Sequence, residues 1–309
     1  MTAQIETDGR EKIPTPAREP LYKTSYRYLL RELHIIGDGL ISGLSESLAL
    51  VKRIFNPKSV DRAIQPQAAW FHIKPAQPNG RAVLLCHGFA ATPEIFRELA
   101  ETLANAGYYV RAIRLSGHGT SLGHLAQTTA VDWFASVVWH YQQTKENYDN
   151  ITFVGHSLGG TLGMILATIY PLQSMIAMCS PVELDIPPAK FVREASILVK
   201  YWPRSRRKRE ALDREGLSSY RASPLYAIGG IFEATQMVRD RADHLTLPML
   251  YVKAVNDHKT LIVQPEKIKK YLTSTPVTFK IAENSPHSVL QGPERELIHE
   301  WILDWLETH

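Results

Sequence analysis

Cysteine is scarce in this chain, since the 309 residues include only Cys86 and Cys179. Each lies inside an apolar run typical of a strand, so we expect two small core residues in a reducing compartment rather than a disulfide or a second nucleophile. The 12 histidines show no H-E-x-x-H or comparable ligand spacing. The sequence therefore predicts no metal site.

Long apolar runs and a strong net charge are also missing. No uncharged apolar stretch reaches about 18 residues, which argues against a membrane span. Residues 1–20 are polar and mixed in charge, without the apolar run of a signal peptide. The net charge of +4 is too mild and too dispersed to indicate nucleic-acid binding. With 44% hydrophobic and 21% charged residues, we expect a soluble globular protein in the cytoplasm.

The N-terminal part differs from the rest of the chain, and we divide the sequence into an N-terminal extension, residues 1–64, and a domain, residues 65–309. Residues 1–20 contain three prolines and are expected to be loosely packed. Apolar residues at helical spacing over 26–55 predict one long helix or two shorter ones, since three glycines fall in the middle. Such helices would pack on the domain or lie on a lipid surface, so residues 21–55 are a candidate peripheral membrane contact.

Past residue 57, strand-like and helix-like segments alternate. The predicted strands are 68–73 (an edge strand), 82–86, 108–115, 151–155, 174–179, 248–255 and 277–282. The predicted helices are 93–106, 131–143, 158–170, 264–272 and 294–308. This alternation predicts an α/β fold, a doubly wound and mostly parallel sheet that binds ligands at the carboxyl ends of its strands.

One segment interrupts the alternation after the sixth strand. Residues 183–246 lack strand character and include a helical pattern over 189–202, so we expect a small helical cap over the active edge. The basic cluster at 204–209 is expected to be a solvated helix face, with an anionic surface contact as the alternative.

The most informative motif is the G-x-S-x-G sequence of residues 155–159. It follows an apolar strand-like run and opens into a helical one, which is the context that this pattern needs. The flanking glycines remove side chains that would clash in a tight turn, and Ser157 can be held there with its hydroxyl outward. We interpret Ser157 as a nucleophile, with the backbone N–H of Leu158 as a donor to a developing oxyanion.

A serine nucleophile needs a base, an acid and a second oxyanion donor. The loop after the first buried strand contains His87 and Gly88, and the N–H of Phe89 is the candidate second donor. His87 competes as a base, but we expect it to support the loop. His118, in a glycine-rich turn, is expected to lie near the site entrance.

Asp257 and His287 are the candidate acid and base. Asp257 ends a strand-like run, and His287 lies between the last strand and the final helix. An ionised Asp257 would hold the imidazole of His287 in the tautomer that accepts a proton from serine. Asp185 is the alternative acid, and His258 is expected to be a neighbour on the solvent side.

With these motifs in their order, the chain resembles serine hydrolases of the α/β-hydrolase superfamily, and more narrowly the bacterial carboxylesterases and monoacylglycerol lipases. The resemblance covers residues 81–306 and rests on LCHGF at 85–89, SGHG at 116–119, GHSLGG at 155–160, MCSP at 178–181, ND at 256–257 and NSPH at 284–287. It implies the α/β-hydrolase fold, no cofactor and a small cap. It also implies Ser157, Asp257 and His287 as catalytic residues, and Phe89 and Leu158 as oxyanion donors.

The expected function is hydrolysis of short- to medium-chain carboxylic esters or monoacylglycerols through an acyl-enzyme. A thioesterase or acyltransferase on the same triad is one alternative. A non-catalytic protein that binds a membrane surface is another, from a different class. The expected partner is a small ester or lipid substrate and not nucleic acid, and the sequence leaves acyl-chain preference and oligomeric state open.

Overall fold

A computed structural model describes residues 4–6, 66–184, 192, 196, 201–203, 220, 222–257 and 265–309. These residues belong to one compact unit made of residues 1–8 and 64–309. A second unit, residues 9–63, lies outside the described residues, and so do the helices predicted for 26–55. None of the helices in the described ranges is long and apolar enough to cross a membrane.

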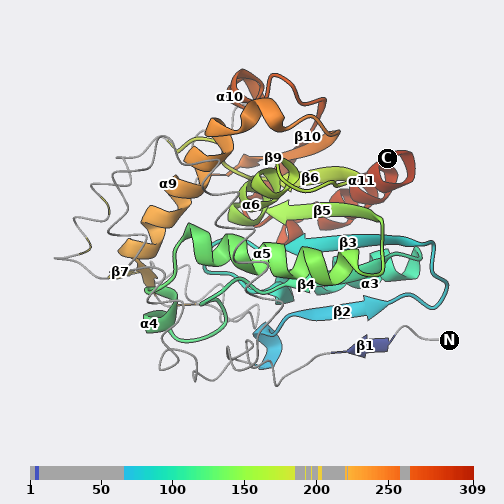
Figure 1. Ribbon diagram of the computed structural model, residues 1–309, viewed down its shortest axis with the longest axis horizontal. Coiled ribbons are helices and arrows are strands. Elements are labelled where there is room, and N and C mark those ends of the chain that lie inside the picture. The colour runs from blue at the N-terminus through green and yellow to red at the C-terminus, as the bar shows by residue number, and fades with distance from the viewer. Residues whose placement is uncertain are drawn as a thin grey trace. The chain divides into compact units, whose positions relative to one another are not determined.

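The unit alternates strands and helices along the chain (Figure 1). The strands are β1 (Gln4–Glu6), β2 (Phe71–Lys74), β3 (Arg81–Cys86), β4 (Tyr109–Ile113), β5 (Asn150–His156), β6 (Ser174–Met178), β7 (Tyr201–Pro203), β8 (Ala222–Pro224), β9 (Met249–Asn256) and β10 (Val277–Pro286). The α-helices are α3 (Arg97–Asn105), α4 (Leu122–Leu125), α5 (Ala130–Lys145), α6 (Leu158–Ala167), α9 (Leu225–Asp240), α10 (Pro265–Tyr271) and α11 (Arg295–Thr308). Short 3-10 helices are η4 (Pro66–Ala68), η5 (Pro93–Phe96), η6 (Ala242–His244) and η7 (Val289–Gln291).

Eight strands form the main sheet in the order β1-β2-β4-β3-β5-β6-β9-β10. The pairs from β4 to β10 are all parallel, whereas β2 is antiparallel to β4 and to β1. The seven predicted strands are all present, and the sheet is mostly parallel as the alternation predicts. The prediction that the first of these strands, 68–73, lies at the edge of the sheet is wrong, because residues 4–6 pair with it as β1. Those three residues are therefore not a loose lead-in.

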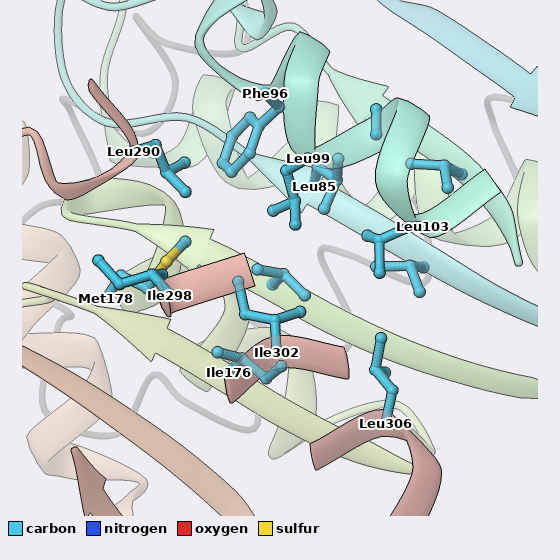
Figure 2. Packing of buried hydrophobic residues seen from close by; sticks show 14 of the residues in the cluster. Leu85, Phe96, Leu99, Leu103, Ile176, Met178, Leu290, Ile298, Ile302 and Leu306 are labelled. Carbon is cyan, nitrogen blue, oxygen red and sulfur yellow. The ribbon is translucent and has the colours of Figure 1, made fainter. Parts of the chain in front are cut away.

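Helices cover both faces of the sheet, α3 and α11 on one and α5 and α6 on the other (Figure 1). The first face holds a large core cluster. Ile298, Ile302 and Leu306 of α11 belong to this core, and in Figure 2 Ile298 and Ile302 lie beside Met178 and Ile176 of β6. Their spacing of four residues places one apolar stripe of the helix against the sheet. Because parallel strands are buried on both faces, β3 to β6 have almost no exposed residue, and this rigid sheet fixes where the loops begin.

The insertion between β6 and β9 departs from the expected cap. Its described part contains a two-stranded antiparallel ribbon, β7 with β8, followed by α9. Residues 201 and 202 are therefore strand and not the end of the helix predicted for 189–202, and the prediction that the insertion lacks strands is wrong. Helix α9 contacts α5 and α6, so the end of the insertion packs on the body of the domain.

Candidate active site

The predicted site residues follow strands that run in the same direction. His87 follows β3, Ser157 follows β5, Asp257 follows β9 and His287 follows β10. Since β3, β5, β9 and β10 belong to one parallel array, their carboxyl ends meet at one edge of the sheet. The sequence correctly places all four residues there.

Ser157 occupies a strained turn between β5 and α6. Its backbone angles are φ 54° and ψ −123°, a conformation that non-glycine residues rarely adopt. Its N–H donates to the carbonyl of Met178 in β6 at 2.8 Å, and its carbonyl accepts from Gly160 N–H at 3.0 Å. These bonds hold Ser157 at the junction of a buried strand and a buried helix, where its side chain is only partly buried.

The glycines of the motif are required because neighbouring backbone segments lie too close for a side chain at these positions. A Cβ at Gly155 would overlap the backbone of Gly159 and Gly160, and a Cβ at Gly159 would overlap the carbonyl oxygen of Cys86 at the end of β3. The start of α6 therefore lies directly against the end of β3. This confirms that the flanking glycines remove side chains that would clash in the turn.

The two predicted oxyanion donors lie in segments that contact each other. An added Cβ on Gly88 would lie 2.9 Å from the Cβ of Ser157, so the loop after β3 lies beside the serine. Phe89 follows in that loop, and Leu158 is the first residue of α6. Within the described residues, neither the Phe89 N–H nor the Leu158 N–H donates to a backbone carbonyl. Both donors thus remain available for a ligand beside Ser157.

His87 supports this loop, as the sequence predicts. Its ring is fully buried, its Nδ1–H donates to Gly88 O at 2.8 Å, and its Nε2 accepts from Leu115 N–H at 3.2 Å. Burial lowers the pKa of His87 to about 4, so the ring is neutral at physiological pH. A base must be able to gain a proton, and both ring nitrogens of His87 are already occupied by the backbone.

His118 is also fully buried. Its ring centroid lies 5.0 Å from that of His87 and 5.9 Å from that of Phe89. Burial, followed by the neighbouring His87, lowers its pKa well below the usual value. His118 therefore packs behind the loop that carries Phe89, as a neutral ring.

His287 and Asp257 form a buried pair, although 30 residues separate them. His287 Nδ1 lies 2.7 Å from Asp257 Oδ2, and the two side chains are 10% and 7% exposed. Since the ionised carboxylate can only accept, Nδ1 carries the hydrogen and Nε2 is left with its lone pair. The pair thus has the tautomer that a general base facing a serine requires.

His156 connects this pair to the serine turn. Its Nε2–H donates to the backbone carbonyl of His287 at 2.8 Å, and the two ring centroids lie 4.9 Å apart. Ser157 is the next residue, although no hydrogen bond between its hydroxyl and the His287 ring is found within the part of the chain that the structure describes. Such contacts often tighten only when substrate binds. The sequence gives no sign of this role for His156, because the two segments are 131 residues apart.

Cys179 lies beside the same pair. A His287 ring nitrogen, an Asp257 oxygen and the Cys179 sulfur all lie within 4.8 Å of one another. Cys179 is 1% exposed and has φ 50° at the end of β6. The prediction of a buried residue is confirmed, but its place next to Asp257 and His287 is visible only in the fold. The alternative acid Asp185, His258 and the basic cluster at 204–209 lie outside the described residues.

Residues 77–294 match the family of serine aminopeptidases S33. A thermostable monoacylglycerol lipase of Bacillus sp. (strain H-257) is 30% identical over 228 residues, which is 74% of this chain and 90% of the lipase. A carboxylesterase of Bacillus subtilis (strain 168) is 26% identical over 228 residues, 74% of this chain and 92% of the esterase.

Among solved structures, a metagenome-derived lipolytic enzyme superposes with a TM-score of 0.68 at 25% identity. The superposition covers 80% of this chain and 100% of that enzyme. The chain belongs to the serine aminopeptidase S33 family and is a serine hydrolase of the α/β-hydrolase fold, related to carboxylesterases and monoacylglycerol lipases.

Proposed function

We propose that this protein hydrolyses carboxylic esters through an acyl-enzyme formed on Ser157. The observation that carries the proposal is the buried hydrogen bond between His287 and Asp257, on a loop that His156 ties to the serine turn. The hydroxyl of Ser157 gives its proton to Nε2 of His287 and attacks the ester carbonyl carbon. Asp257 stabilises the imidazolium that results.

The negative charge on the carbonyl oxygen is received by the N–H groups of Phe89 and Leu158. Two features support this role: the contact between Gly88 and Ser157, and the absence of backbone acceptors for either N–H within the described residues. A pair of fixed donors stabilises the tetrahedral intermediate more than the ground-state carbonyl. His287 then protonates the leaving alcohol, and water attacks the acyl-enzyme with His287 as base again.

The substrates we propose are short- to medium-chain carboxylic esters and monoacylglycerols, in keeping with what the two Bacillus relatives are named for. The names of the relatives do not favour a thioesterase, an acyltransferase or a non-catalytic binding protein. We propose that the insertion between β6 and β9 serves as the cap over the site. We also propose a cytoplasmic enzyme in which residues 21–55 make a peripheral membrane contact, which flotation with liposomes, with and without that segment, tests.

The experiment is a chain-length series of p-nitrophenyl esters and monoacylglycerols, run beside acyl-CoA and acceptor alcohols. We expect hydrolysis of the oxygen esters, with a maximum below the long acyl chains. A Ser157→Ala variant should lose that activity while keeping its circular dichroism spectrum and melting temperature. Faster turnover of acyl-CoA than of any oxygen ester would contradict the proposal. Ester hydrolysis by Ser157→Ala at the wild-type rate would contradict it as well.

A further inference from the structure

Tyr220 joins the insertion between β6 and β9 to the loop that carries Phe89. The side chain lies two residues before β8 and is 9% exposed. Its ring forms a small apolar cluster with Ala90 and Leu125, and Phe89 packs against this cluster. A residue of the insertion therefore shares an apolar cluster with the loop that supplies one of the proposed oxyanion donors.

The hydroxyl of Tyr220 fixes a second segment behind that loop. It donates to Gly117 O at 2.7 Å and accepts from Thr120 N–H at 3.1 Å. Gly117 and Gly119 have φ of 77° and 70°, a conformation that glycine adopts easily and other residues rarely do. One phenol group thus bridges the two ends of a glycine-dependent turn.

That turn carries His118, whose ring touches the loop after β3 from behind. The His118 ring meets Phe89 edge to face at 5.9 Å and lies 5.0 Å from His87, which itself holds Gly88 O. Arg114 adds a hydrogen bond to His118 O at 3.1 Å. A displacement of the turn would therefore be transmitted to Phe89 through packed rings.

The loop needs such support because Ala90 is strained. Ala90 directly follows Phe89 and has φ 56°, which is unfavourable for a residue with a Cβ. Ala91 N–H closes the turn onto Gly88 O at 3.2 Å. A strained backbone persists only when its surroundings hold it in place, and the Tyr220 ring is part of those surroundings.

We propose that Tyr220 is a positioning residue that aims the Phe89 N–H at the oxyanion, through the apolar cluster that it shares with Ala90 and through its bridge across residues 117–120. The insertion would then contribute to the rate of ester cleavage and not only cover the site. This inference rests on the proposed ester hydrolysis by Ser157, because only a developing oxyanion has a use for the aligned N–H.

The test compares Tyr220→Phe, which removes the bridge, with Tyr220→Leu, which also removes the ring from Ala90. We expect kcat to fall about threefold in the first and about tenfold in the second, with KM within about twofold of the wild type. A trifluoromethyl ketone, whose adduct with Ser157 places a negative oxygen at the same donors, should lose affinity by the same factors as kcat. Tyr201→Leu, at a half-exposed position of the same insertion, is the matched control and should change neither.

A double variant separates alignment from general loosening. Ala90→Gly accepts a positive φ without strain, so Ala90→Gly combined with Tyr220→Leu should recover at least threefold of the lost kcat. Absence of that recovery would overturn the role given to Ala90.

Unchanged kcat and ketone affinity in both single variants, or a loss confined to KM, would overturn the proposal for Tyr220. If Tyr220→Leu does not fold, Tyr220→Phe decides alone, because it keeps the packing. These outcomes assume that wild-type activity disappears in Ser157→Ala. Activity that survives in Ser157→Ala would instead overturn the proposed function.

Discussion

His156 donates a hydrogen bond from Nε2 to the backbone carbonyl of His287 at 2.8 Å, and Ser157 follows His156 directly. The nucleophile and the proposed base thus share a contact that does not involve substrate. This bond fixes the start of the loop after β10, where His287 also meets Asp257. The relative position of Ser157 and His287 is therefore set partly by the residue before the serine.

Replacing His156 should impair catalysis more than binding. In His156→Leu the carbonyl of His287 loses its donor, and we expect kcat to fall about tenfold with little change in KM. His156→Gln can still donate to that carbonyl. The fall in log kcat in His156→Gln should therefore be less than half of the fall in His156→Leu. Steady-state kinetics of both variants check this, and equal activity in the two would show that the hydrogen bond has no catalytic role.

Gly88→Ala should slow the enzyme sharply. The new Cβ would lie 2.9 Å from the Cβ of Ser157 and 3.3 Å from His156 O, so the loop with Phe89 must move away from the serine. Since a shift of about 1 Å in a reacting group can cost about 100-fold, we expect kcat to fall 10- to 100-fold.

Gly80→Ala is the control for Gly88→Ala. Nothing lies within 4 Å of a Cβ there, but φ is 79°, so the cost is backbone strain of about 1–2 kcal/mol in the free energy of unfolding. Activity of Gly80→Ala should match the wild type, as measured by the same ester assay. Full activity in Gly88→Ala would show that the loop after β3 does not serve the reaction.

The sequence predicts those parts of the fold whose patterns are strong and local. The strands at 82–86 and 151–155 are continuous apolar runs because parallel strands are buried on both faces. The G-x-S-x-G motif is recognisable in the sequence because the tight turn between strand and helix leaves no room for side chains at its glycines. The order of the motifs then places Asp257 and His287 at the same edge as Ser157, as the structure does.

The missing parts depend on contacts between distant segments. Strands β1, β7 and β8 have three residues each, too few for a periodic pattern, and they are defined only by their partners. Helix α9 contains Gly229 and Gly230, which weaken a helical pattern. Gly230 is explained by its close approach to Trp133, where an added Cβ would lie 2.9 Å from the indole ring. The contacts of His156 and Tyr220 follow from the folded chain alone.

Asp257→Asn should leave the protein folded and nearly inactive. The amide can occupy the same position, but by donating its own N–H it favours the His287 tautomer that keeps the hydrogen on Nε2. We expect kcat to fall by about 10⁴-fold, measured on the ester that the wild type cleaves fastest. A loss of less than tenfold would show that another group serves as the acid.

The free energy of unfolding should fall in acid, because two histidines that are buried in the neutral form take up protons more readily when the chain unfolds. Burial lowers the pKa of His87 to about 4 and that of His140 well below its usual 6.5, so the unfolded chain binds more protons than the folded one below pH 6.5. The free energy of unfolding therefore decreases as pH falls from 6.5 toward 4.

His140→Phe keeps an aromatic ring beside Trp70 and removes one of these titrating groups. We expect the unfolding free energy of this variant to depend less steeply on pH in that range. Urea titrations between pH 4.5 and 7.5 measure it. The same dependence in the variant and the wild type would show that His140 is not held neutral by burial.

The most direct measurement is the reaction of the intact protein with a fluorophosphonate probe, followed by mass spectrometry of its peptides. If Ser157 is a nucleophile activated by His287, one phosphonyl group should attach to the peptide that contains Ser157, and ester hydrolysis should stop in proportion to labelling. His287→Ala should prevent the labelling. Full labelling at another residue, or ester hydrolysis that persists when Ser157 is completely modified, would contradict the assignment of Ser157 as the nucleophile.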